Sequence, residues 1–351
     1  MKLISREQFL QYAGQGEILS DLLLTSCDLS GVDLSGKIFE RCCFENCLMN
    51  GTILSGSSFS SCSFSMVSLK SAQLQRANLR GICLAGLDLS GADMSEAILE
   101  QADLSGANLS LANLSHAASD GIDLHGARLT GAGLVMASLD AANLSGADLT
   151  RADLSQADME GCRLDGTIFN ATLCIKTFMN NCSLKQQRFP GCNLTMAHFE
   201  GADLSGADLT GADITQAGFE SAVLDGANFS GIIATAVRFE RARAARAVFK
   251  GAHLPFADFS GAMLEGADFG GAALPNARFA AASCKGANLS RVDLDCADLS
   301  HCDLTGANLS HSNLKLALLH AARRESANLS GARIETARLD DRELLEAENW
   351  R

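Results

Sequence analysis

A single five-residue period runs through this chain without a break. The positions taken in steps of five from Leu24 to Leu339 number 64, and 58 of them hold Leu, Ile, Met or Phe. The exceptions are Ser119, Cys174, Ala234, Ala244, Cys284 and Arg324. A period of five fits neither a helix nor a simple strand, whose side chains repeat every 3.6 and 2 residues. It predicts a solenoid, in which short repeats stack on one another.

The chemistry of the repeat explains how each unit of five folds. Its consensus is A-(D/N)-L-(S/T)-G, as in residues 102–106 and 202–206. In an extended backbone Ala and Leu, two residues apart, face inward, and the Asp or Asn between them faces outward. Ser or Thr followed by Gly favours a turn, because Gly adopts a positive φ without a steric clash. Each pentad is therefore predicted to be a very short strand and a corner.

This pattern resembles the pentapeptide repeat family over about nine-tenths of the chain. The resemblance implies an all-β solenoid, a right-handed quadrilateral parallel β-helix of about 16 four-pentad coils. We expect an N-terminal cap at residues 1–21, the β-helix at 22–340 and a C-terminal helical cap at 341–351. Ser5 and Gln8 have the spacing of a capping box, which predicts a short helix in the first cap.

Composition narrows the classes of function. The formal net charge of −13 disfavours nucleic acid as a direct ligand. No apolar run is long enough to span a membrane, and the N-terminus lacks the features of a signal peptide. We therefore expect a cytoplasmic protein, although a leaderless route of secretion stays open.

The cysteines and histidines give little support for a catalytic, metal or cofactor site. Most of the thirteen cysteines stand in the inner slot that usually holds Ala, and no CxxC spacing occurs, so we expect buried apolar cysteines and neither metal nor cofactor. His301 and His320 are expected to adjoin, because residue 321 stacks on residue 301, either as a solvated pair or as a ligand pair. No catalytic motif is present, so an enzyme is not expected.

One column of corners differs from the others. The fifth pentad position is usually Gly, but from residue 76 onward one corner in each coil holds other residues. Large apolar side chains recur there and predict a ridge that binds a partner protein, formed by Met136, Met196, Phe256 and Leu316. A different turn type that does not need Gly is the alternative explanation.

Three further segments depart from the repeat. A basic patch in one coil is a candidate docking site for an acidic partner; its residues are Arg238, Arg241, Arg243, Arg246 and Lys250. Residues 161–195 are the least regular, with Thr or Gln in several inner slots. The last segment predicts a helix that covers the final coil or joins two copies in a homodimer, through Leu344, Leu345 and Trp350.

Two functions remain open from the sequence. The first is a non-catalytic scaffold for protein–protein interaction, possible partners including type VI secretion components, beside which pentapeptide proteins resembling this one occur. The second is an acidic mimic of DNA that binds and modulates or protects DNA gyrase or topoisomerase, an activity known in some members of the family. The chain departs from those members in its length, its basic coil and its lack of projecting loops. The identity of the partner does not follow from the residues.

Overall fold

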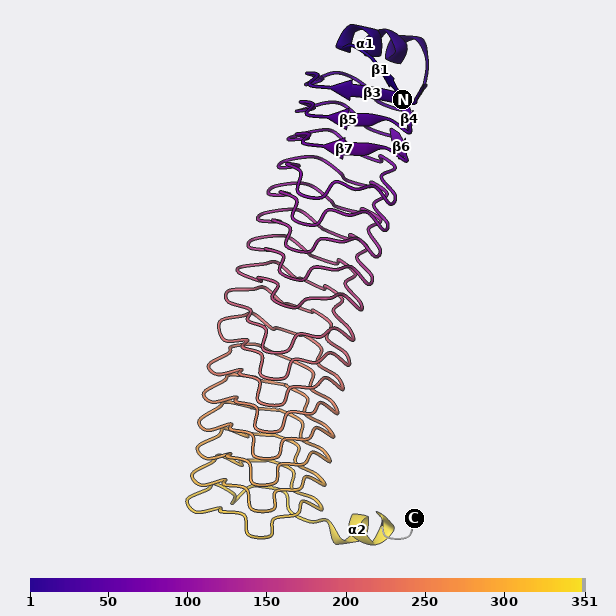
Figure 1. Ribbon diagram of the computed structural model, residues 1–351. Coiled ribbons are helices and arrows are strands. Elements are labelled where there is room, and N and C mark those ends of the chain that lie inside the picture. The colour runs from indigo at the N-terminus through magenta and orange to yellow at the C-terminus, as the bar shows by residue number, and fades with distance from the viewer. Residues whose placement is uncertain (349–351) are drawn as a thin grey trace. The chain divides into compact units, whose positions relative to one another are not determined.

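The computed structural model describes residues 1–348, without the side chains of Arg342 and Leu344. It divides into two compact units, Met1–Phe178 and Met179–Arg351. Each unit is a right-handed quadrilateral parallel β-helix, as the pentads and the resemblance predict, and its residues pair with those twenty positions further on (Figure 1). The boundary between the units falls inside the least regular stretch of the sequence.

Regular strands are confined to the start of the first unit, where two parallel sheets form. In one, the order is β1-β3-β5-β7, and in the other it is β2-β4-β6. Elsewhere in both units the coils are joined by single parallel bridges with the same twenty-residue register. The strands are β1 (Lys2–Leu3), β2 (Ile18–Ser20), β3 (Leu22–Thr25), β4 (Ile38–Glu40), β5 (Cys43–Glu45), β6 (Ser58–Ser60) and β7 (Ser63–Ser65).

A typical corner shows why the pentad ends in Ser-Gly. The Ala107 N–H donates to the Leu104 carbonyl at 3.1 Å, and Gly106 between them has φ 64°. A positive φ at the third residue is the requirement of a type II turn. The Gly106 N–H donates to the His125 carbonyl of the next coil at 2.7 Å. Each corner therefore closes itself and also pairs with its neighbour.

The core of each unit is a column of large and small inward side chains. In the second unit phenylalanine side chains form two facing columns. Stacked rings in one column lie 4.6–5.3 Å apart, and rings from the opposite column meet them edge-on, as Phe239 does with Phe249 at 5.6 Å. Alternating stacked and edge-on contacts are favourable arrangements for aromatic quadrupoles.

Several threonines and cysteines in the inner slot make one recurring bond. The hydroxyls of Thr167, Thr172 and Thr177 donate to the carbonyls 23 residues earlier at 2.7–2.9 Å. The Cys42 and Cys162 thiols donate to equivalent carbonyls at 3.2 and 3.0 Å. Most of the thirteen cysteines are buried, so they are small core residues that also act as weak donors.

Helix α1 (Arg6–Gln15) covers the first coils of the first unit (Figure 1). The predicted capping box is formed, because the Gln8 N–H donates to Ser5 Oγ and the Ser5 N–H donates to Gln8 Oε1. Phe9 is fully buried and meets the Phe44 ring edge-on at 6.4 Å. The strand ladder also includes β1 and β2, so it begins before residue 22, and α1 is inserted into it.

Tyr12 is not part of the apolar core beneath α1. Its side chain is 39% exposed, and its hydroxyl accepts a hydrogen bond from Lys2 Nζ at 2.9 Å. Lys37 stands in an inner slot, and its ammonium leaves the core to donate to the Gly16 carbonyl at 3.0 Å. The end of α1 therefore gives this buried stem a polar partner.

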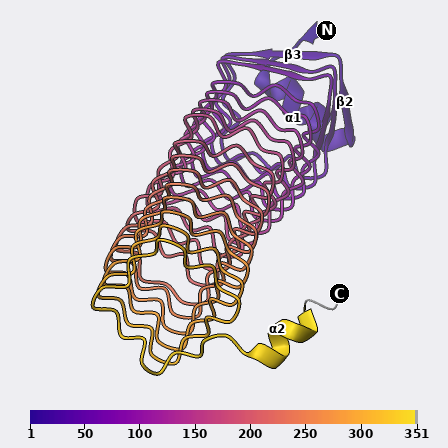
Figure 2. The same cartoon turned by 90° about the horizontal axis from the view of Figure 1, so that it is seen from below.

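Within residues 1–348 the last coil of the second unit is less buried than the coil before it. Helix α2 (Arg342–Glu348) lies beside the last coil, as Figure 2 shows. The inner residues Leu329 and Ile334 are only half-buried and Leu339 is 50% exposed, whereas Leu309 one coil earlier is fully buried. The cover predicted for the last coil depends on Leu344, Leu345 and Trp350, and only Leu345 has a described side chain, so it stays a prediction.

Candidate interaction surfaces

The column of corners in which glycine is replaced from residue 76 onward keeps the same left-handed backbone as the glycine corners. Gly36 and Gly56 have φ 65°, and from Arg76 to Leu316 the non-glycine residues of this column have φ between 53° and 61°. The alternative of a different turn type is therefore wrong. A left-handed conformation is unfavourable for a residue with a side chain, by about 1–2 kcal/mol.

The predicted ridge residues lie at these corners in both units. In the second unit Phe256 is 59% exposed and Leu316 is 44% exposed, and Met196 is half-buried. Met136 is 49% exposed at the equivalent corner of the first unit. Large apolar side chains are thus held outward on left-handed backbone, where they contribute little to the core.

Two exposed apolar corners escaped the sequence analysis. Met66 is 75% exposed and Leu111 is 74% exposed, and both have a positive φ. They stand in other corner columns of the first unit, so comparing all the corners for residues other than glycine would have found them. Apolar corners are therefore not limited to the ridge.

The basic patch separates into paired and unpaired members. Arg238 and Arg243 form ion pairs with Glu220 at 3.1 Å and Asp225 at 3.2 Å. Within residues 1–348 no ion pair of 4.0 Å or less is formed by the remaining three residues, Arg241, Arg246 and Lys250. The patch thus offers fewer free charges than its sequence implies.

Arg241 and Arg246 occupy two successive corners of one coil, each with φ 57°. Their aliphatic stems lie over the glycine corners of the next coil, where a Cβ on Gly261 or Gly266 would meet an arginine Cγ at 3.4 or 3.6 Å. The stems are therefore supported by the backbone, and the guanidinium groups reach outward.

The acidic residues of the pentads have a structural use. Asp103 Oδ1 accepts the Ser105 N–H at 2.9 Å, and Asp203 Oδ1 accepts the Ser205 N–H at 3.1 Å. These Asx turns rigidify the approach to the corner. Hydrogen bonds from Ser105 hold the pKa of Asp103 below its usual range. Much of the negative charge is thus required by the turns themselves.

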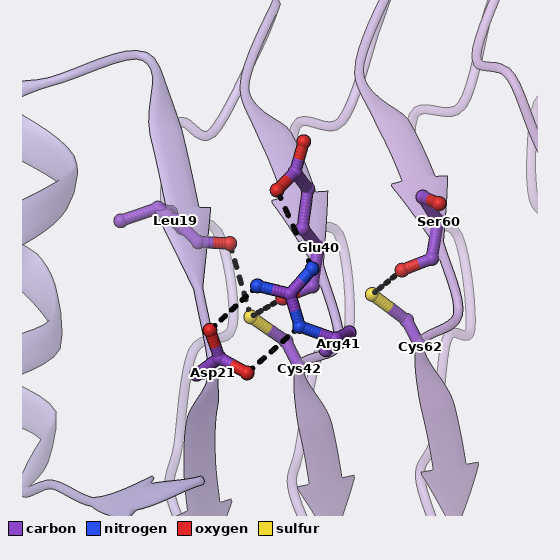
Figure 3. Close-up of polar contacts among 7 residues, drawn as sticks. All are labelled: Leu19, Asp21, Glu40, Arg41, Cys42, Ser60 and Cys62. Carbon is purple, nitrogen blue, oxygen red and sulfur yellow. Dashed lines mark hydrogen bonds and ion pairs between the residues drawn. The ribbon is translucent and has the colours of Figure 1, made fainter.

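At the start of the first unit, Arg41 and two cysteines form a local polar cluster (Figure 3). Arg41 donates to both oxygens of Asp21, at 2.8 and 2.6 Å, and this contact lowers the pKa of Asp21. A hydrogen bond from the Cys62 thiol lowers the pKa of Cys42 to about 7 and raises the pKa of Cys62. Cys42 is only 1% exposed, so its sulfur is closed to a substrate and the cluster is structural.

The predicted dimer segment is only partly described. Leu345 is half-buried on α2, while Trp350 and the side chain of Leu344 lie outside the described residues. Neither helix in residues 1–348 combines the length and apolarity that crossing a membrane would require.

Comparison with known proteins gives one extensive match. Residues 18–56 and, in overlapping segments, residues 72–341 match a family model described as pentapeptide repeats. No curated protein matches the chain.

Solved structures match with low scores. HetL, a pentapeptide repeat protein involved in heterocyst differentiation regulation in the cyanobacterium Nostoc, is 22% identical over 96% of this chain and 98% of its own, with a TM-score of 0.22. Trypsin-treated QnrB1, a plasmid-mediated fluoroquinolone resistance protein, is 22% identical over 59% of this chain and 83% of its own, with a TM-score of 0.29. A pentapeptide repeat protein of the Arabidopsis thaliana thylakoid lumen is 32% identical over 32% of this chain and 65% of its own, with a TM-score of 0.12.

Proposed function

Because this chain belongs to the pentapeptide repeat family, whose repeats fill most of residues 18–341, we propose that it is a non-catalytic scaffold for protein–protein interaction. The observation that carries this proposal is the set of large apolar side chains on left-handed corners. Glycine is the residue that suits this backbone, and many other corners use it. Exposed apolar residues held at an unfavourable φ are better explained by contact with a partner than by stability.

The spacing of these residues indicates the kind of partner. Met196, Phe256 and Leu316 stand three coils apart in one corner column of the second unit, or roughly 14 Å per step at the usual strand spacing. Such separate contacts are too sparse for the dry core of a large interface. They suit an extended protein segment that runs along the corners and contacts each side chain in turn.

A photo-crosslinking residue placed at position 256 in the native cell tests this proposal. We expect it to capture one protein, and the variant Phe256→Asp/Leu316→Asp to lose that protein in co-purification. The matched control is Met66→Asp/Leu111→Asp, which also places charge at exposed apolar corners, but outside the ridge column. Equal loss of the partner in both double variants would contradict the assignment of the ridge.

The alternative function is an acidic mimic of DNA that acts on DNA gyrase or topoisomerase. The net charge of −13 favours it. Two observations weigh against it, since Asx turns account for the repeated aspartates and Arg241 and Arg246 interrupt the acidic surface. Inhibition of gyrase supercoiling, or its protection from a quinolone, at sub-micromolar protein would reverse our ranking.

The cellular setting of the scaffold is part of the proposal. We place it in the cytoplasm, with no direct binding to nucleic acid, as its acidity favours. Type VI secretion components remain the first partners to test in the crosslinking experiment, a choice that comes from the family resemblance.

Self-association through the C-terminal end is a separate proposal. The half-buried residues Leu329 and Ile334 and the exposed Leu339 leave apolar surface and a sheet edge at the last coil, and such edges tend to pair. We expect a homodimer that uses this end together with Leu344, Leu345 and Trp350. Light scattering on a chain ending at Leu339 should show a weakened dimer, whereas Phe256→Asp/Leu316→Asp should leave it intact. The reverse pattern would show that the two surfaces are assigned the wrong way round.

A further inference from the structure

Three side chains of metal-ligand type meet at the end of the second unit. His301 Nε2 lies 3.4 Å from one carboxylate oxygen of Glu348, and His320 Nε2 lies 3.4 Å from the other. The three ligand atoms lie within 4.8 Å of one another. We propose that His301, His320 and Glu348 bind one divalent cation of the zinc class, and that this ion fastens α2 to the last coils.

The distances favour a shared ion over direct hydrogen bonds. A charge-assisted bond from imidazole to carboxylate is usually about 2.7–2.9 Å long, so 3.4 Å is too long for a strong one. Zinc binds histidine nitrogen and carboxylate oxygen at about 2.0–2.2 Å, which places two ligands of a tetrahedron about 3.3–3.5 Å apart. Each histidine nitrogen already has this separation from one of the two Glu348 oxygens.

The fold brings the two imidazoles together by its register. His301 is a left-handed corner residue with φ 58°, and its N–H donates to the His320 carbonyl of the next coil at 2.8 Å. The rings are perpendicular, with centroids 5.5 Å apart. The adjoining pair expected from the sequence is thus confirmed, and His320 is only 9% exposed. No sequence pattern pointed to the third ligand, because Glu348 reaches the pair only through the path of α2.

The surroundings carry more negative than positive charge. The two histidines and Glu348 line a groove of about 590 Å³ that is also lined by Asp340, Asp341 and Arg338. Arg338 opposes a cation there, and Arg324 pairs with Asp340 at 3.4 Å, so three carboxylates face two arginines. Asp340 accepts from the Ala321 N–H and from Arg324, and Asp341 accepts from the Glu343 N–H, so the fourth position of a tetrahedral ion is left to water.

One hydrogen bond must change when the ion binds. The Asp341 N–H donates to His320 Nδ1 at 3.2 Å, so the neutral ring carries its proton on Nε2. A metal on Nε2 moves that proton to Nδ1, where ligating histidines usually donate to a carboxylate or carbonyl. Breaking the existing bond costs about 1 kcal/mol, far less than a typical zinc site contributes. Residues 340–341 are therefore expected to shift on binding.

The consequence is a metal-dependent position for α2. The two histidines belong to successive coils and Glu348 ends the helix, so one ion would join all three. This helix lies beside the open edge of the last coil, which makes the accessibility of that edge dependent on the ion. The inference is independent of the proposed ridge.

Equilibrium dialysis of the full chain against Zn²⁺, with reductant present, tests the site. Because thirteen cysteines add background binding, the comparison is between variants. We expect His301→Ala and Glu348→Gln each to lose one equivalent of Zn²⁺, or to bind it at least 10-fold more weakly. His311→Ala is the matched control, since His311 is an exposed histidine outside the cluster, and it should bind as the wild type does.

Histidine side-chain NMR gives a readout that cysteine binding does not affect. With ¹⁵N-labelled histidine, one equivalent of Zn²⁺ should shift the ring nitrogens of His301 and His320 and leave those of His311 in place. The shifts should disappear in Glu348→Gln if the helix supplies the third ligand. Unchanged dialysis in both variants, or Zn²⁺ shifts that spare His301 and His320, would overturn the proposal.

Discussion

Replacing alanine by glycine lowers stability in ordinary helices and strands, but at the left-handed corners of this fold we expect it to raise stability. Ala281 and Gly286 are successive exposed corners of one coil, with φ 57° and 63°. Their N–H groups make the same kind of bond to the next coil, at 2.9 and 3.0 Å. A Cβ added to Gly286 would meet no atom within 4 Å. The pair therefore isolates the backbone term from packing.

The expected magnitude follows from two opposing effects. Relief of the left-handed conformation contributes about 1–2 kcal/mol in favour of glycine. The greater conformational freedom of glycine in the unfolded chain reduces this gain in stability by about 0.5–1 kcal/mol. The Ala281→Gly variant should therefore be more stable by about 0.5–1 kcal/mol, and Gly286→Ala should be less stable by a similar amount.

Urea unfolding followed by circular dichroism measures the difference. With a slope of about 3 kcal/mol per molar, a change of 1 kcal/mol moves the midpoint by about 0.3 M, and the slope itself should not change. Ala273→Gly is the control, because Ala273 is not at a positive φ and the exchange there should lower the midpoint. A lower midpoint for Ala281→Gly, in step with the control, would refute the reasoning from corner strain.

Three more outcomes can be checked in the same way. Phe249→Ala should lose about 3–5 kcal/mol because its ring is fully buried between stacked neighbours, whereas Phe256→Ala should lose much less because its ring is 59% exposed; equal losses in urea unfolding would contradict the inward and outward assignment. Hydrogen bonds from Thr305, with help from Lys285, lower the pKa of Asp303 to about 2, so its contribution to stability is full above about pH 4 and is lost as the pH falls toward 2. The difference in urea midpoint between wild type and Asp303→Asn should therefore narrow over that range, and a difference that stays constant from pH 5 to pH 2 would argue against this origin. Insertion of one residue after Gly206 should shift the following inward residues out of phase and sharply lower the melting temperature of the second unit. An unchanged melting temperature would contradict this expectation and would show that a corner accommodates the extra residue as a bulge.

The repeat predicted the fold well because each pentad independently carries the same pattern of inward, outward and corner residues. The N-terminal boundary could not be placed from it, because α1 interrupts the pentads. Ile4 and Leu19 keep the phase of the later core residues and are buried, but the helix between them hides the connection. The capping box of Ser5 was predictable because it is a local motif.

The surfaces were predicted less completely. Corner positions, and so the exposure of Phe256, follow from the five-residue phase. The φ of those corners does not, because a sequence without glycine there is equally consistent with another turn type. Similarly, the pairing of His301 with His320 follows from the register. The place of Glu348 depends on the direction in which the chain leaves the last coil, which no periodic pattern encodes.

The twenty-residue register also bears on how the chain folds during its synthesis. In each unit, the bridge partner of a new residue was made one coil earlier, so a finished coil can serve at once as the template for the next. A ribosome adds about 5–20 residues per second, which allows one to four seconds per coil, whereas short elements form within microseconds. The early helix α1 gives the first coils a closed end. At any moment of synthesis the growing edge of a unit is therefore its last finished coil, and the next twenty residues pair with it.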